Sequence, residues 1–199
     1  MGMRRREFLQ VVGGVATTWP LAVRAQQLSM PVVGILDGTP PGAFAYAMPA
    51  YWQGLGEAGY VEDRNVTALY RSAEDQNDRL PALAAELVGR GVAVIVTTGG
   101  TVSAIAAKSA TTTIPIVFIL GADPVAFGLV ASLSRPGGNV TGVNFLVNML
   151  VPKRLELLHE LVPRAASIGM LVDPNNPNAE TDTSSALAAA AAIGKQFTS

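Results

Sequence analysis

The chain has 199 residues, of which 49% are hydrophobic and 15% are charged. This length accommodates one or two small domains with a real core, and the composition excludes a disordered chain. Residues 1–25 carry four arginines and one acid, so the remainder holds ten basic and fourteen acidic side chains, a net charge of −4. A mildly acidic body lacks the clustered Lys and Arg that phosphate backbones require, so no nucleic acid is expected as a partner.

Several chemistries lack their usual residues. The chain contains no cysteine, which excludes disulfides, thiolate metal ligands, thiol nucleophiles and a lipid anchor on an N-terminal Cys. There is no G-x-G-x-x-G after an expected strand and no P-loop lysine motif, so no nucleotide cofactor is expected. His159 is the only histidine, which leaves no partner for a zinc site, so no metal is expected either.

Residues 1–25 contain the three parts of an export signal in their usual order. Arg5 and Arg6 precede a fifteen-residue, weakly apolar run over 8–22, and a small residue, Ala25, follows. The run is shorter than the roughly 20 apolar residues of a membrane span. The arginine pair predicts twin-arginine export, cleavage after Ala25 and a periplasmic protein with no direct membrane anchor after cleavage. General secretion, and a cytosolic protein with a basic tail, are the alternatives.

Short apolar runs alternate with helical patterns along the rest of the chain. Strands are predicted at 32–36, 65–70, 92–97, 114–120, 140–145 and 168–172. Helices are predicted at 49–58, 78–88, 101–109, 124–133, 153–161 and 179–193. This alternation, with strands nearly continuous in Val, Ile and Leu, predicts an α/β fold with a parallel sheet and flanking helices. A soft boundary near 147–152 predicts an N-terminal α/β lobe over 26–147 and a second over 148–199.

Ligands of open parallel sheets bind outside the carboxyl ends of the strands, and three such ends carry turn residues. These ends are 37–42, 97–101 and 121–124. Their glycines allow close backbone approach, and free N–H groups at a helix start favour an anion such as a carboxylate. The candidate ligand-binding residues are Asp37, Gly38, Thr39, Thr98, Gly99, Gly100, Thr101 and Asp123.

Each of these segments also has a purely structural interpretation. Asp37 and Gly38 suit a simple turn. The segment 98–101 suits a strand-to-helix connection with a Thr as N-cap. Asp123 followed by Pro124 suits a helix N-cap with proline in the first turn. The sequence leaves these alternatives open.

Catalytic constellations are not evident. His159 lies beside the apolar stripe of its predicted helix, which favours a surface or boundary histidine, and a catalytic triad lacks its usual parts. The acids at 74, 75 and 78 form a polar lead-in to a helix, where they suit the helix dipole. A binding module rather than an enzyme is therefore predicted. The alternative is a periplasmic α/β enzyme with a hydroxyl nucleophile, which would need a base within hydrogen-bond reach of a Ser or Thr.

Seven segments carry a resemblance to a known family. They are residues 59–66, 80–88, 114–118, 123–125, 134–142, 153–158 and 172–174. In this order they resemble the ABC transporter substrate-binding proteins whose best-understood members bind tryptophan or another aromatic amino acid. The match covers nearly all of 31–194, and the Arg-Pro-Gly-Gly-Asn-Val-Thr-Gly run within 134–142 is its most specific part.

The resemblance implies a two-lobed type I periplasmic binding protein. It implies that a small molecule, such as an amino acid or related carboxylate, binds between the lobes and is delivered to the membrane subunits of an ABC permease. It adds Asp173, which would face the strand ends from the second lobe. Asp63 departs from the family, which usually has Gly there. Because family members run well beyond 199 residues, the first lobe is expected to be nearly complete, the second only begun, and a non-functional truncated remnant is the remaining alternative.

Overall fold

The computed structural model describes residues 30–199, and a compact unit runs from Val32 to Ser199. The predicted export signal, residues 1–25, and its cleavage site lie outside the described residues. From residue 30 onward, no helix is both long enough and apolar enough to span a bilayer.

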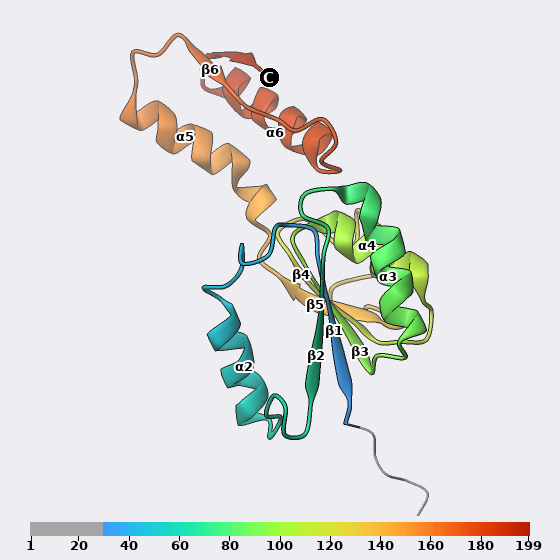
Figure 1. Cartoon of the computed structure of the whole chain (residues 1–199). Helices are drawn as coiled ribbons and strands as arrows, with labels where there is room; N and C mark the ends of the chain where they lie inside the picture. Colours follow the sequence, from blue (N-terminus) through green and yellow to red (C-terminus); the bar gives the residue numbers. More distant parts are fainter. Residues whose placement is uncertain (1–29) are drawn as a thin grey trace, which may run out of the picture. The chain divides into compact units, whose positions relative to one another are not determined.

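The larger sheet has five parallel strands, as the sequence predicted (Figure 1). The strands are β1 (Val32–Asp37), β2 (Thr67–Ser72), β3 (Val94–Thr98), β4 (Ile116–Leu120) and β5 (Val140–Asn144), in the spatial order β2-β1-β3-β4-β5. The apolar runs of β1, β3 and β4 lie in the middle of the sheet and are largely buried. The β2 segment is shifted two residues toward the C-terminus relative to the expected 65–70.

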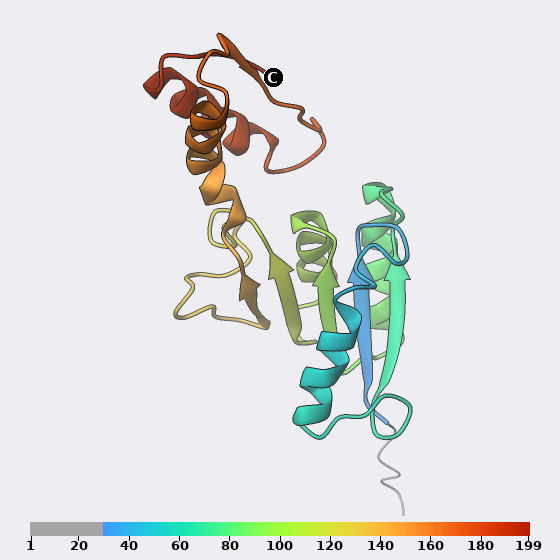
Figure 2. The ribbon, with the colours of Figure 1, turned by 90° about the vertical axis from the view of Figure 1, so that its left-hand side faces the viewer.

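Helices cover both faces of this sheet, α2 on one side and α3 and α4 on the other (Figure 2). Their bounds are α2 (Met48–Glu57), α3 (Leu80–Gly89), preceded by the 3-10 helix η2 (Asn77–Arg79), and α4 (Thr101–Ala110). The main core lies beneath α3 and α4, where Leu80, Leu87 and Ile95 are buried. A smaller core beneath α2 contains Val33 and Ile35.

The strand order places a switch point between β1 and β3. β2 pairs with one edge of β1, and β3 pairs with the other edge. The chain continues from β1 to α2 and from β3 to α4. These helices lie on opposite faces of the sheet. Asp37 and Thr98, the last residues of the two strands, are register partners. A crevice at such a switch point is where open α/β sheets bind ligands.

The predicted helix over 124–133 is wrong. The chain forms turns there, with Leu129 N donating to Pro124 O at 2.8 Å and Gly128 in a left-handed conformation with φ of +62°. Lys108 Nζ, from α4, donates to Gly128 O and, at 3.2 Å, to Leu129 O. Gly128 thus ends the helical path after one turn, and the core takes up Leu129 directly behind it.

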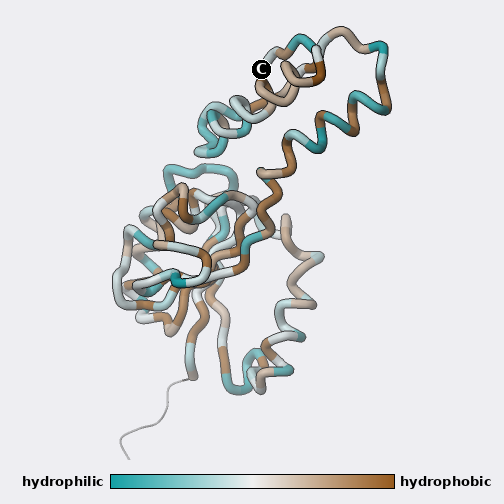
Figure 3. The backbone as a smooth tube through the Cα atoms, turned by 180° about the vertical axis from the view of Figure 1, so that it is seen from behind, coloured by the Kyte–Doolittle hydropathy of each residue, from teal (hydrophilic) through white to brown (hydrophobic). Residues whose placement is uncertain are grey.

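The C-terminal part forms a second, smaller α/β arrangement. Its elements are the 3-10 helix η3 (Val147–Leu150), α5 (Val151–Leu161), β6 (Ser167–Gly169), α6 (Ala179–Ala192) and β7 (Gln196–Thr198). β6 is shorter than the predicted 168–172 and pairs in parallel with β7, which the sequence did not indicate. Hydrophobic and hydrophilic stretches alternate along α5, as expected of a helix with one apolar face (Figure 3).

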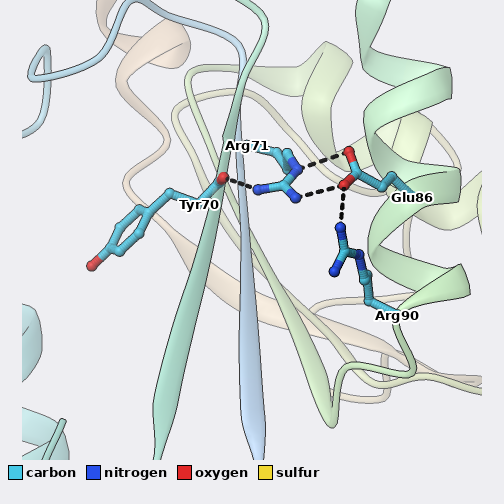
Figure 4. A network of polar contacts seen from close by, with 4 residues as sticks. All are labelled: Tyr70, Arg71, Glu86 and Arg90. Carbon is cyan, nitrogen blue, oxygen red and sulfur yellow. Dashed lines mark hydrogen bonds and ion pairs between the residues drawn. The ribbon is translucent and has the colours of Figure 1, made fainter. Parts of the chain in front are cut away.

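An ion-pair network ties edge strand β2 to α3 (Figure 4). Arg71 Nε donates to Glu86 Oε2 at 2.8 Å, the second guanidinium nitrogen reaches Oε1 at 2.5 Å, and Arg71 also donates to Tyr70 O at 2.7 Å. Arg90 lies 3.5 Å from the same carboxylate. The Arg71 hydrogen bonds lower the pKa of Glu86. The bidentate contact between Arg71 and Glu86 holds the carboxyl end of β2 against α3.

Candidate ligand-binding site

The turns that follow β1 and β3 interlock at the switch point. Gly38 N donates to Thr98 O at 3.3 Å, so the two turns are joined through their backbones. Gly99 has a φ of +74°, and a side-chain carbon there would collide with Asp37 Oδ1 and the nitrogen of Gly38. Only glycine combines that conformation with so close an approach. The interlocking fixes both turns at the carboxyl edge of the sheet.

Polar groups within the β1 turn satisfy one another. Asp37 Oδ1 accepts hydrogen bonds from Thr39 N at 2.9 Å and from Thr39 Oγ1 at 2.8 Å. Ser72 Oγ, at the end of β2, donates to Thr39 O at 2.6 Å. These contacts support the turn interpretation of Asp37 and Gly38, and a ligand contact by Asp37 or Thr39 stays a prediction.

The start of α4 has no side-chain cap among the described residues. Gly100, with φ of +114°, is the N-cap, so the interpretation with a Thr as N-cap is wrong. The N–H groups of the first turn therefore have no side-chain partner and, with the helix dipole, favour an anion. Thr101, the first helical residue, is 3% exposed, and its Oγ1 accepts a long hydrogen bond from Asn178 Nδ2 at 3.4 Å.

A polar cavity of about 310 Å³ lies against this helix start. Part of its lining comes from the segments that follow β1, β2 and β3, namely Gly38, Asp75, Asn77, Gly99, Gly100, Thr101 and Val102. From the segment between β6 and α6, Asp173, Asn176, Pro177 and Asn178 complete it. The structure thus brings Asp173 to the predicted strand-end residues, and its role in binding stays a prediction. Sequence reasoning missed Asp75, which it assigned to a helix lead-in.

A second cavity, about 450 Å³ and mostly apolar, adjoins the first through Gly99 and Gly100, which line both. Four aromatic side chains form part of its wall, Phe44, Tyr46, Tyr51 and Phe145, beside Ile35, Val96 and Leu120 from the sheet. Sequence reasoning missed this cavity. The sequence feature that could have indicated this cavity is a group of four aromatic residues between 44 and 52, in a chain with only 6% aromatic residues.

Two hydroxyl groups of the apolar cavity are notable. Thr98 lines it, and Thr98 Oγ1 is buried with no hydrogen-bond partner in the part of the chain that the structure describes. Tyr51 lies on the wall formed by α2, where burial, and then the charges of Tyr70 and Glu62, raise its pKa. Burial thus favours the neutral form of the Tyr51 phenol, whereas the Thr98 hydroxyl is enclosed and unpartnered among the described residues.

The remaining candidates lie elsewhere. Asp123 is exposed, its Oδ1 accepts from Val125 N at 2.9 Å, and it lines neither cavity. Since no helix follows Asp123, the helix N-cap interpretation is also wrong, and a ligand contact by Asp123 stays a prediction.

His159 is half-buried and lines a separate cavity of about 220 Å³ with Ser167 and Lys195. Within residues 30–199, no cluster of three or more His, Cys, Asp or Glu could hold a metal ion.

The fold is that of type I periplasmic binding proteins. A leucine-binding protein from Thermotoga maritima superposes with a TM-score of 0.62 over 85% of this chain and 48% of that one, at 14% identity. At this identity the likeness concerns the fold alone.

Residues 43–195 match the family model described as ABC transporter substrate binding protein, so the chain belongs to that family. A tyrosine-binding protein from Clostridioides difficile is 32% identical over 139 residues, 70% of this chain and 39% of that protein. The structure of an ABC domain from Streptococcus pneumoniae in complex with L-Trp has a TM-score of 0.74 at 26% identity. A conserved domain protein from Vibrio cholerae has a TM-score of 0.75 at 31% identity.

The chain spans only part of the length of these relatives. It covers 39% of the tyrosine-binding protein and 56% of each of these two solved chains, while 85% of this chain is matched to either structure. At the family level the relatives are substrate-binding proteins of transporters rather than enzymes.

Proposed function

We propose that the protein is the solute-binding component of an ABC importer and that its ligand is an amino acid with an aromatic side chain, or a related carboxylate. The protein captures this ligand in the periplasm and delivers it to the membrane subunits of a permease. The observation that carries the proposal is the meeting of two unlike cavities, one polar and one aromatic, at Gly99 and Gly100. The relatives named for tyrosine and solved with L-Trp support the same ligand class.

The two cavities suit the two ends of such a ligand. The uncapped N–H groups at the start of α4 and the hydroxyl of Thr101 suit a carboxylate. An aromatic ring in the second cavity would bury its surface against Phe44 and Phe145. At roughly 25 cal/mol per Å² of apolar area, burying a ring contributes several kcal/mol before binding costs are subtracted.

The proposal includes no enzymatic activity. A hydroxyl nucleophile at the candidate site needs a base within hydrogen-bond reach. Thr39 Oγ1 has such a contact with Asp37 Oδ1 at 2.8 Å, but the same oxygen also accepts from Thr39 N, so the pair closes a turn. His159 lines a different cavity.

Calorimetric titration of the protein with L-tryptophan, L-tyrosine, L-leucine and L-lysine tests the ligand class. We expect the aromatic amino acids to bind at least tenfold tighter than the other two. Tyr46→Leu, in the apolar cavity, should weaken aromatic binding, whereas Tyr60→Leu, on an exposed turn outside both cavities, should not. Binding without aromatic preference would refute the ligand class, and a folded protein that binds none of these would favour a non-functional remnant.

We also propose export through the twin-arginine pathway, with cleavage after Ala25. The order of arginine pair, short apolar run and small residue in 1–25 supports this, and so does membership of a family that serves importers. Replacing Arg5 and Arg6 together by Lys should retain the precursor in the cytoplasm, as seen by cell fractionation. Unchanged export would instead assign the protein to general secretion.

A further inference from the structure

We propose that Asp75, in the turn after β2, recognises the ammonium group of the bound amino acid together with Asp173. The inference rests on the proposed function and deepens it by assigning the positively charged end of the ligand. Both residues line the polar cavity, Asp75 from the turn after β2 and Asp173 from the segment between β6 and α6.

The backbone holds Asp75 at this position. Asp75 N donates to Gly38 O at 2.9 Å, which attaches the residue to the interlocked turn at the end of β1. Glu74 and Asp75 are both left-handed, with φ of +56° and +62°, a conformation uncommon for residues other than glycine. Two successive residues of this kind persist where the surroundings determine them, and they cluster at binding sites. The observation that points to a ligand is the cavity that Asp75 shares with the start of α4.

The charges of the cavity are complementary to an amino acid. Asp75 and Asp173 are its only charged lining residues within 30–199, and both are acidic. Neither forms an ion pair with a described residue, whereas the neighbouring Glu74 lies 3.5 Å from Arg79. The uncapped start of α4 forms another part of the same wall and supplies the positive end of a helix dipole. A ligand with one positive and one negative group satisfies both.

The carboxylate of Asp75 thus differs from the other acids of this turn. Glu74 lines a different cavity, beside Arg71 and Arg79. Asp78, three residues further on, is exposed, as Asp75 is, but lines none of the cavities described here. Asp78→Asn removes the same charge from the same turn region and is therefore the matched control for Asp75→Asn.

The test compares L-tryptophan with 3-(indol-3-yl)propionate, which has the same ring and carboxylate and no ammonium group. In titrations of the wild-type protein we expect L-tryptophan to bind at least tenfold tighter. Asp75→Asn should weaken L-tryptophan binding about tenfold and leave the propionate unchanged or slightly tighter, because only the former loses a charge partner. Asp78→Asn should change neither affinity.

Asn tolerates the left-handed conformation, so Asp75→Asn should fold, and equal unfolding midpoints by circular dichroism would verify this. Asp75→Gly, which suits the same φ and lacks the carboxylate, serves as a second variant. If both variants weaken the two ligands equally, or neither, the assignment of Asp75 is wrong while the proposed function stands. If the wild-type protein binds neither L-tryptophan nor L-tyrosine, the proposed function fails and this inference with it.

Discussion

Adjacent glycines at the candidate site have different tasks. A side chain on Gly99 would meet the backbone of the β1 turn, whereas a side chain on Gly100 would meet nothing within 4 Å. Gly99 therefore serves the interlocking of the two turns, and Gly100 leaves space open where the polar and apolar cavities join. One glycine positions the site, and the other keeps it accessible.

Substituting Gly99 by Val should weaken the binding of an aromatic amino acid by well over tenfold, about 1.4 kcal/mol or more. The reason is displacement of the Asp37 and Gly38 turn rather than a direct block of the ligand. Calorimetric titration measures the loss. Gly91→Val is the control, since Gly91 has a similar φ of +65° and open space around it. Unchanged affinity in a folded Gly99→Val variant would place the site elsewhere.

Thr101→Val replaces a buried hydroxyl by a methyl group of similar size. If Thr101 donates to the ligand carboxylate, the affinity should fall several-fold, while the free energy of unfolding changes by only about 1 kcal/mol. Thr111→Val is a suitable comparison: Thr111 Oγ1 accepts from Thr113 N and Ile114 N, far along α4 from the site. That variant should lose stability and retain affinity. Loss of affinity in both would indicate a general effect on α4.

At the scale of elements, the two helix layers contribute unequally. α3 and α4 bury side chains in the main core, whereas α2 has no fully buried residue and contacts the sheet through half-buried Met48, Tyr51 and Trp52. Tyr51 and Trp52 pack edge to face, with ring centroids 5.2 Å apart. α2, which also walls the apolar cavity, is therefore the more easily displaced layer.

The raised pKa of Tyr51 predicts an alkaline loss of stability. Because burial favours the neutral phenol in the folded state, its contribution is fully present below pH 10 and is lost as pH rises through the folded-state pKa. Denaturant titrations between pH 8 and 11.5 should show the free energy of unfolding decreasing above pH 10. Tyr51→Phe should reduce this slope, and Tyr60→Phe, on the exposed turn, should not. Equal slopes in wild type and Tyr51→Phe would contradict the assignment.

At the scale of the whole molecule, the five-stranded sheet has two core clusters, and no residue from Val151 onward belongs to either. Leu161 is 79% exposed, Leu171 is fully exposed, and half-exposed leucines of α5 lie near them in sequence. An apolar surface of this kind favours association. The hydrogen bonds from Asn148 to both carboxylate oxygens of Asp182, at 2.9 and 2.8 Å, join η3 to α6.

The chain should therefore associate as its concentration rises. Light scattering after size exclusion should show an apparent mass that increases between low and high micromolar concentrations. Leu161→Lys should reduce that increase because it places a charge on the exposed apolar surface. Gln53→Lys, on exposed α2, adds the same charge elsewhere and should leave association unchanged. A concentration-independent monomer would show that the exposed leucines do not mediate contacts.

The sequence by itself determined the parallel α/β fold and, to within one residue, the ends of β1 and β3 at Asp37 and Thr98, because apolar periodicity and turn residues are local signals. The prediction of a helix over 124–133 was wrong because Gly128 adopts a left-handed conformation and its carbonyl accepts a hydrogen bond from Lys108 of α4. The contact with Lys108 joins two segments distant in sequence, so local periodicity does not indicate it.

Only the tertiary structure decided which residues share a cavity. The aromatic wall joins residues near position 45 to Phe145, and the polar cavity joins Asp75 to Asp173. These pairs lie about a hundred positions apart in the chain, and their meeting depends on the strand order and on the crossing at η3. The spacing of residues in the sequence indicates neither the strand order nor the crossing, because both result from the packing of the whole chain.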